Sequence, residues 1–246
     1  MIHQKYARYY KEIFGFPGFF SEPVIVFGWP EIRVKPLHFE RWSGLPLRLK
    51  WKKAVRAWRW QRRALLGSIH PDLELSDEFR YADLVECLAD RGLKEVSVID
   101  LFDSRADKRY DMNDPVPESE HERYGTFMDI GSLEHVFDTR QCIENSLRMV
   151  RPGGIYMLQT NVNGLYDHGF HVFSPEALVR ALELNGFEIL YHRYSTKDGA
   201  PVQDPSRARH VMIWLVARKI APLKSFTVPQ QGFWEHRYDE LERPEG

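Results

Sequence analysis

The stretch from residue 124 to residue 160 constrains the fold of this chain most strongly, because it holds two apolar runs with a helical pattern between them. Phe127 to Ile130 is a mostly apolar run of the length expected for a buried parallel strand. Asp138 or Thr139 can cap the helix that follows. The apolar positions of that helix recur at helical spacing, at Ile143, Leu147 and Val150.

The predicted helix is followed by Pro152, Gly153 and Gly154 and then by an apolar run over residues 155–160. Proline cannot continue a helix and glycine accepts the turned backbone beyond it, so we expect the helix to end here. The run after the glycines predicts a second strand. A strand, a crossing helix and a further strand form a right-handed βαβ unit, which indicates a parallel α/β sheet.

The rest of the chain adds further elements of the same kind. Strands are predicted over residues 23–28, 64–68, 95–100, 187–194 and 210–217, and helices over residues 3–14, 77–91 and 174–184. We take residues 64–68 as the first strand of the sheet. The last two strands read as an antiparallel pair that closes it. The predicted fold is a doubly wound, mostly parallel, seven-stranded Rossmann-like sheet with an antiparallel last strand.

Composition argues against a nucleic-acid-binding protein and against a disulfide-rich secreted protein. A chain of 246 residues with 43% hydrophobic and 28% charged residues suits one globular α/β domain with an appendage. The net charge of -1 gives no overall attraction to nucleic acid, which we do not expect as a partner. Cys87 and Cys142 are expected to be reduced core residues. The N-terminus lacks the apolar region of a signal peptide, so a cytoplasmic enzyme is expected.

Residues 47–63 form a second unusual stretch, with eight lysines or arginines, three tryptophans and no acid. Read as a helix, the stretch places Trp51, Val55 and Trp58 on one stripe flanked by basic residues. This pattern suits a helix that packs its tryptophans on the domain and keeps its arginines in water. It also suits peripheral attachment to an anionic membrane, a site for a phosphate-bearing acceptor, or contact with single-stranded nucleic acid.

Three phrases of the sequence together resemble the class I S-adenosylmethionine-dependent methyltransferases, in their small-molecule branch. The phrases are LEHVFD, RMVRPGG and HGFHVFSPEALVRALELNGFEI, and the resemblance extends from about residue 96 to residue 218. It implies S-adenosylmethionine as cofactor, S-adenosylhomocysteine as product and a small-molecule acceptor. The predicted domains are an aromatic and basic extension over 1–62, a methyltransferase-like domain over 63–220 and a tail over 221–246 that packs on the domain.

The resemblance also assigns cofactor contacts, which should lie at the carboxyl ends of the central strands. Asp100 ends a predicted strand, where a carboxylate can accept both hydroxyl hydrogens of a ribose. Leu101 and Phe102 would line the adenine, and Asp111 would lie near its amino group. After the next strand, Gly131 would let the backbone approach the methionine part of the cofactor. The remaining implied contacts of the cofactor are Ser132 and Glu134.

The acceptor is expected at the segment 161–171, which follows a strand and should cross the mouth of the site. His168 is the first candidate for the general base, with Asp167 to orient it, and an ordinary surface histidine is the alternative. His135 is a second candidate, unless the Glu-His pair has a structural role. The expected acceptor-binding residues are Asn161, Asn163, Tyr166 and His171. Asp167, His168 and His171 lie too close in sequence, without a distant ligand, to predict a metal.

One departure from the resembled family bears on activity. Its members have a glycine-rich turn after the first strand, and here residues 65–71 offer Gly67 alone. Either Gly67 suffices for cofactor binding, or the chain is a catalytically degenerate methyltransferase fold that serves as a binding or scaffold subunit. The predicted reaction is O-methylation of a small molecule, with a sugar or glycan acceptor as the expected class. Homo-oligomerisation is left open by the sequence.

Overall fold

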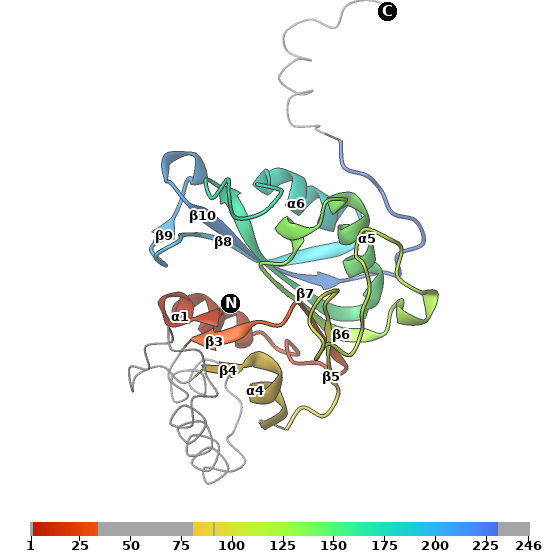
Figure 1. The fold of residues 1–246 in the computed structure, drawn as a ribbon. Coiled ribbons are helices and arrows are strands. Elements are labelled where there is room, and N and C mark those ends of the chain that lie inside the picture. The colour runs from red at the N-terminus through yellow and green to blue at the C-terminus, as the bar shows by residue number, and fades with distance from the viewer. Residues whose placement is uncertain (1, 34–80, 91, 231–246) are drawn as a thin grey trace, which may run out of the picture.

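The computed structural model describes residues 2–33, 81–90 and 92–230 of the chain (Figure 1). Its main feature is a seven-stranded sheet with the order β5-β2-β6-β7-β10-β8-β9. The strands are β2 (Val24–Phe27), β5 (Val96–Ile99), β6 (Tyr124–Ile130), β7 (Val150–Asn163), β8 (Phe187–Thr196), β9 (Pro201–Val202) and β10 (Val211–Lys219). Neighbours from β5 to β7 pair in parallel, and β10 is antiparallel to both β7 and β8. The predicted fold class is confirmed.

The first strand of this sheet differs from the prediction. β2 is the second strand from the β5 edge of the sheet, between β5 and β6, and its four buried residues pair on both sides. Residues 64–68, with Gly67, and the basic stretch 47–63 lie outside the described residues. The sheet therefore begins before residue 63, in contrast to the domain boundary expected there.

A second, three-stranded sheet was not expected. It has the order β1-β3-β4, with β1 (Ile2–His3), β3 (Glu31–Arg33) and β4 (Tyr81–Asp83). The helix predicted over residues 77–91 is wrong for residues 81–83, because these residues pair with β3 instead. The helix α4 (Leu84–Asp90) starts only after this strand.

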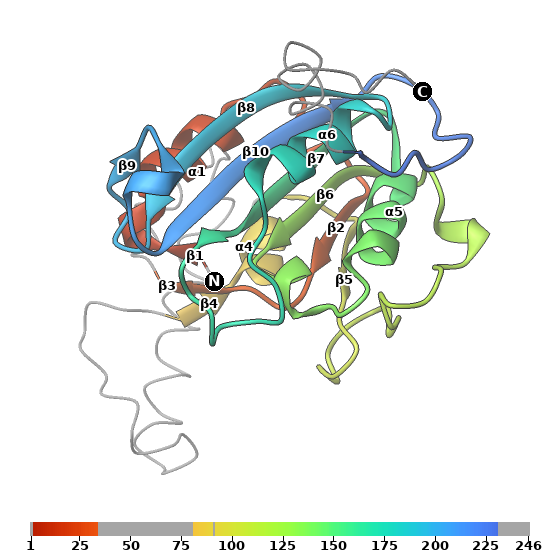
Figure 2. The same ribbon diagram turned by 90° about the horizontal axis from the view of Figure 1, so that it is seen from above.

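Helices cover both faces of the large sheet (Figures 1 and 2). The helices α1 (Ala7–Phe14) and α4 bury apolar side chains against one face, with Val24, Val26 and Met128 of the sheet. The helices α5 (Thr139–Met149) and α6 (Pro175–Glu183) cover the opposite face, together with Ile25 and Phe127. Successive residues of a strand face opposite sides, so β2 and β6 contribute to both cores.

The N-terminal helix is bound to the sheet through aromatic rings. Tyr9 stacks on Trp214 of β10 with ring centroids 4.9 Å apart. Tyr10 meets the same indole edge to face at 5.2 Å and donates a hydrogen bond from its hydroxyl to Gln159 Oε1 at 2.8 Å. Aromatic pairs of this kind add to the free energy of burial. Residues 7–14 therefore belong to the core of the domain.

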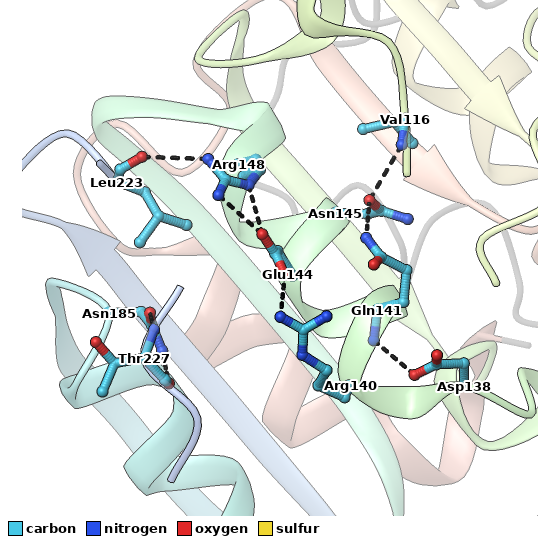
Figure 3. A network of polar contacts seen from close by, with 10 residues as sticks. All are labelled: Val116, Asp138, Arg140, Gln141, Glu144, Asn145, Arg148, Asn185, Leu223 and Thr227. Atoms are coloured by element: carbon cyan, nitrogen blue, oxygen red, sulfur yellow. Dashed lines mark hydrogen bonds and ion pairs between the residues drawn. The ribbon is translucent and has the colours of Figure 1, made fainter. Parts of the chain in front are cut away.

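Polar side chains of α5 connect the helix to two distant segments (Figure 3). Asp138 caps the helix by accepting from Gln141 N at 2.9 Å, as the sequence predicted. Asn145 accepts from Val116 N at 3.1 Å, and Arg148 donates to Leu223 O at 3.4 Å. Thr227 N donates to Asn185 Oδ1 at 2.8 Å, so the described part of the tail, residues 221–230, contacts the domain.

The turn between α5 and β7 is tighter than predicted. The helix ends at Met149, and Val150 already pairs with Tyr124, so β7 includes Pro152–Gly154 and extends to Asn163. Short 3-10 helices occupy Gln4–Tyr6 (η1), Glu118–Glu120 (η2), Leu133–His135 (η3) and Pro205–Arg207 (η4). Within the described ranges, the helices are too short or too polar to cross a membrane.

Candidate functional site

The carboxyl ends of β2, β5 and β6 lie at the same edge of the sheet. Phe27 is in register with Ile99 on one side and with Asp129 on the other. Gly28 N donates to Ile99 O at 2.8 Å, so the turn after β2 begins beside Asp100. This edge is where doubly wound sheets bind their ligands.

Gly28 is a site residue that the sequence analysis missed. Its φ is +78°, and a Cβ built on it would lie 2.6 Å from Ser132 Oγ. The Ser132 hydroxyl donates to Phe27 O at 2.8 Å and so joins the end of β2 to the turn after β6. Only glycine fits this left-handed, crowded position. Residues 23–28 had been recognised as a strand that ends in glycine, which was the signal that could have found it.

Trp29 follows this glycine and carries a buried donor. Its indole Nε1 finds no hydrogen-bond partner among the described residues, although Arg105 lies over the ring at 4.3 Å. A buried N–H without an acceptor costs free energy unless a ligand or water supplies one. The orphaned donor is thus available to a ligand group or to water beside the turn after β2.

The loop after β5 carries four of the predicted cofactor contacts. Asp100 Oδ1 accepts from Phe102 N at 2.8 Å and from Asp103 N at 2.9 Å. Phe102 is 88% exposed and Leu101 40% exposed, so both apolar side chains are open to a ligand. Asp111 Oδ1 instead accepts from the backbone and side-chain nitrogens of Asn113, at 2.9 and 2.7 Å, and no described contact joins it to Asp100.

Asp129, near the end of β6, was not singled out by the sequence analysis. It is fully buried, and Oδ1 accepts from Ser132 N at 2.9 Å while Oδ2 has no partner among the described residues. Burial, followed by the nearby charge of Glu134, raises the pKa of Asp129 to about 8. The carboxyl group is therefore mostly protonated at neutral pH. Its position within an apolar strand gave no sign of this in the sequence.

Glu134 lies in η3 and is 1% exposed. Its Oε2 accepts a hydrogen bond from Thr160 Oγ1 of β7 at 2.8 Å. Its Oε1 lies 3.8 Å from His168 Nε2, and a Cβ on Gly131 would come within 3.3 Å of that same oxygen. The carboxylate thus stands between the turn after β6 and the segment after β7.

The structure brings the two predicted base candidates together. The rings of His135 and His168 lie 5.1 Å apart, edge to face, and both side chains are exposed. Glu134, His135 and His168 each offer one ligand atom, and these atoms all lie within 4.8 Å of one another. Asp167 and His171, which the sequence analysis weighed with His168 as metal ligands, are not part of this group, and its acid is Glu134 from a different segment.

The segments 134–137 and 168–171 run side by side because their backbones are bonded. Phe170 N donates to Glu134 O at 2.8 Å, and a Cβ on Gly169 would approach that oxygen to 2.7 Å. The rings of Phe137 and Phe170 lie 5.8 Å apart and are 74% and 69% exposed. An exposed aromatic pair therefore flanks the histidine pair.

The remaining predicted residues have varied surroundings. Asn163 donates to Pro205 O and Ala208 O at 2.9 and 2.8 Å, which gives it a structural role in holding η4. Asn161 is buried, donates to His171 O at 3.0 Å and leaves its Oδ1 without a partner in the described part of the chain. Both asparagines lie in β7 and not in a loop as predicted.

Asp167 does not orient His168 in this structure. It is exposed, and within the described ranges no hydrogen bond or ion pair joins it to the imidazole. Tyr166 is 77% exposed, and His171 places Nε2 3.0 Å from Phe137 O. The carboxylate partner of His168 is Glu134.

Two hollows lie elsewhere on the described surface. One, of about 280 Å³, is lined by His121, Glu122, Arg148, Pro222, Leu223 and Lys224. The other, of about 400 Å³, lies at the start of α6 and includes His192 and Tyr194. Neither contains a residue predicted to contact cofactor or acceptor.

No protein-family model matches the sequence, and no curated protein matches it. Several solved structures are similar in shape. A protein of Listeria monocytogenes assigned to the S-adenosylmethionine-dependent methyltransferases is 12% identical over 87% of this chain and 96% of its own, with a TM-score of 0.46. An S-adenosylmethionine-dependent methyltransferase from Mesorhizobium loti is 15% identical over 53% of this chain and 83% of its own, with a TM-score of 0.39.

A third similar structure contains ligands. The 1,6-didemethyltoxoflavin-N1-methyltransferase of Burkholderia thailandensis, with its substrate and S-adenosylhomocysteine bound, is 14% identical over 55% of this chain, with a TM-score of 0.38. This chain spans 65% of the length of that enzyme. At TM-scores below 0.5 these similarities carry no argument about activity, which has to come from the residues at the sheet edge.

Proposed function

We propose that this chain transfers the methyl group of S-adenosylmethionine to a hydroxyl oxygen of a small, ring-bearing acceptor. One observation carries the proposal. A left-handed glycine turn after β2, an acid after β5 and a cluster of Glu134, His135 and His168 after β6 and β7 meet at one edge of a doubly wound sheet. Ligands of such sheets bind at this edge.

The residues at this edge fit the proposed cofactor. Gly28 and Gly131 both have φ of +78° and keep the two central turns free of side chains. Both backbone bonds to Asp100 end on Oδ1, which leaves Oδ2 for a ribose hydroxyl. The orphaned indole N–H of Trp29 supplies a donor beside the first turn. When bound, S-adenosylmethionine supplies a methyl group activated by a sulfonium centre.

The chain's own contribution to the reaction is alignment and removal of a proton. The bound cofactor would supply the methyl carbon to the acceptor oxygen and would keep the electron pair of its broken carbon–sulfur bond on sulfur. The hydroxyl proton has to leave the acceptor. We assign its removal to the cluster around Glu134, in which His168 lies 3.8 Å from the carboxylate.

Exposed rings support the proposed acceptor class. Phe137 and Phe170, which pair edge to face beside the cluster, and Tyr166, two residues before His168, are each more than two-thirds exposed. Exposed apolar groups gathered next to polar, titratable ones are typical of ligand sites. They support an acceptor with a flat or puckered ring, such as a sugar or an aromatic alcohol, whose face packs on these side chains.

Calorimetric titration of the full chain with S-adenosylmethionine and S-adenosylhomocysteine tests the proposal. We expect micromolar binding of both ligands and its loss in Asp100→Ala. Asp103→Ala is the matched control, because Asp103 lies in the same loop but directs its carboxylate to Arg105. Equal loss in both variants would assign the effect to the loop and not to a ribose contact. No binding of wild-type protein at millimolar ligand overturns the proposal in favour of a degenerate scaffold.

A further inference from the structure

We infer that Glu134, His135 and His168 bind a divalent transition-metal ion, with Zn²⁺ as the best match. Two imidazole nitrogens and one carboxylate oxygen come from two separate segments of the chain, after β6 and after β7. Zn²⁺ sites that take part in reactions use three protein ligands of these types and keep a fourth position open. No such site follows from the proposed methyl transfer itself.

The geometry is within reach of an ion. Zn²⁺ bonds to imidazole nitrogen and carboxylate oxygen at about 2.0–2.2 Å, so two ligand atoms of a tetrahedral site are roughly 3.3–3.6 Å apart. The distance between His168 Nε2 and Glu134 Oε1 is 3.8 Å, and all three ligand atoms lie within 4.8 Å of one another. The two histidine side chains are exposed, so small rotations of their rings close the remaining gap.

Glu134 provides the second line of evidence. It is 1% exposed, and within the described ranges its one ionic contact is with His168. A buried carboxylate is expensive to keep charged unless a cation or a metal compensates it. Thr160 Oγ1 holds Oε2 at 2.8 Å, which turns Oε1 toward the histidines. Hydrogen bonds of this kind to the free oxygen are what orient carboxylate ligands in metal sites.

The surroundings fit a cation further. Among the described residues, no lysine or arginine forms an ion pair with the Glu134 carboxylate. Imidazole ligands select a transition metal over Mg²⁺ or Ca²⁺, which prefer oxygen.

The role of the ion rests on the proposed function, whereas its binding does not. A hydroxyl at the open position of such an ion would lose its proton more easily, to solvent, and the two imidazoles would then act as ligands and not as the base. Glu134 Oε1 lies against Gly131, where the cofactor's methionine part is expected. The ion would thus hold the acceptor oxygen beside the methyl group and would explain why two histidines meet there.

Zinc binding to the full, chelator-treated chain tests the inference without any cofactor. We titrate Zn²⁺ against a chromophoric chelator and expect one ion per chain. His168→Ala and His135→Ala should each weaken binding by more than about 10-fold, since both remove a ligand. His121→Ala is the matched control, because His121 lies in the hollow beside Leu223 and away from the cluster. The zinc affinity of the His121→Ala variant should equal that of the wild type.

Two outcomes overturn the inference. One is no binding at millimolar Zn²⁺, and the other is equal affinity in the wild type and in the His135→Ala and His168→Ala variants. Glu134→Gln is a third ligand variant whose folding is checked by circular dichroism. Because Glu134 is buried, the two exposed histidines decide the result if that variant fails to fold. Titration with S-adenosylhomocysteine in the presence of chelator separates failure of the metal site from failure of the proposed function.

Discussion

Two acidic regions of this protein lie at the same edge of the sheet and differ in how their carboxylates are satisfied. In the loop after β5, the acids accept hydrogen bonds from their own neighbourhood: Asp100 from Phe102 N, Asp103 from Arg105, Asp107 from Val98 N and Asp111 from Asn113. At the end of β6, Asp129 leaves an oxygen without a partner, and Glu134 depends on Thr160 and His168 from other segments.

The difference separates acids that fold a loop from acids that need a ligand or a proton. A carboxylate bonded within its own loop is solvated and inexpensive wherever the loop lies. A carboxylate buried at the junction of three strands is costly unless it is protonated or compensated. The number of acids in a segment is therefore a poor guide to a functional site. A better guide is whether their hydrogen-bond partners come from the same loop or from other segments.

The largest expected effect concerns Asp129→Asn. Because the pKa of Asp129 is raised to about 8 by burial, the folded protein holds a proton that the unfolded chain releases above about pH 4. Stability should fall as pH rises through this window. The variant should remove that fall and gain up to roughly 5 kcal/mol at pH 8, less about 1–3 kcal/mol for an unsatisfied amide. Urea unfolding from pH 5 to 8.5 with chelator present measures it.

The control for this prediction has the opposite sign. Hydrogen bonds from Arg105 lower the pKa of Asp103 to about 2, so its contribution to stability is present above the unfolded pKa and is lost only as pH falls toward 2. In the Asp103→Asn variant, the free energy of unfolding should vary with pH between 5 and 8.5 as it does in the wild type. A slope that persists in Asp129→Asn would assign the pH dependence to another group.

A smaller effect on stability is expected at Gly28, where the end of β2 contacts the turn after β6. Gly28→Ala forces a side chain into φ of +78° and against Ser132 Oγ, whereas Gly153→Ala has the same φ with nothing within 4 Å. The left-handed conformation costs about 1–2 kcal/mol in both variants. Overpacking should cost Gly28→Ala about 1–3 kcal/mol more. Equal denaturation midpoints of the two variants would show that Ser132 moves aside at little cost.

Thr160→Val should cost less, about 1–2 kcal/mol, because it leaves one oxygen of buried Glu134 without its donor. Thr160→Ser retains the hydroxyl and should recover most of the stability. In the zinc titration Thr160→Val should also weaken binding by about 10-fold, since the carboxylate is no longer oriented. If Thr160→Val keeps the stability and the zinc affinity of the wild type, the hydroxyl has no role.

The sequence predicted the βαβ unit and the closing antiparallel strands because their apolar periodicity is local and strong. It took residues 64–68, which lie outside the described residues, as the first strand, whereas β2 comes earlier in the chain and already pairs in the sheet. An apolar tetrapeptide such as Val24–Phe27 does not reveal which neighbours it pairs with. Paired strands are set by contacts between distant residues, and so is the sheet of β1, β3 and β4.

The sequence predicted only part of the candidate site, because it shows local patterns and not contacts between distant segments. Residues that end strands, such as Asp100 and Gly131, follow from the pattern, and so does the choice of His135 and His168 as chemically interesting. That these two rings meet, with Glu134 and not Asp167 beside them, depends on the backbone bond from Phe170 N to Glu134 O. A bond between segments separated by a whole strand cannot be read from either segment alone.

The smallest expected effect on stability has the sharpest consequence for function. Asp100→Asn keeps one oxygen to accept from Phe102 N and Asp103 N, and it replaces the second, charged oxygen proposed for the ribose by an amide nitrogen. Stability should change by no more than about 0.5 kcal/mol, as for other locally satisfied surface positions. Binding of S-adenosylhomocysteine should weaken by about 10–100-fold, because a charged acceptor is worth about 1.5–3 kcal/mol to a hydroxyl donor. Unfolding and calorimetry on one preparation separate the two effects. Unchanged affinity for S-adenosylhomocysteine would mean that Asp100 only stabilises its own loop. All the acids after β5 would then differ in the same way from Asp129 and Glu134.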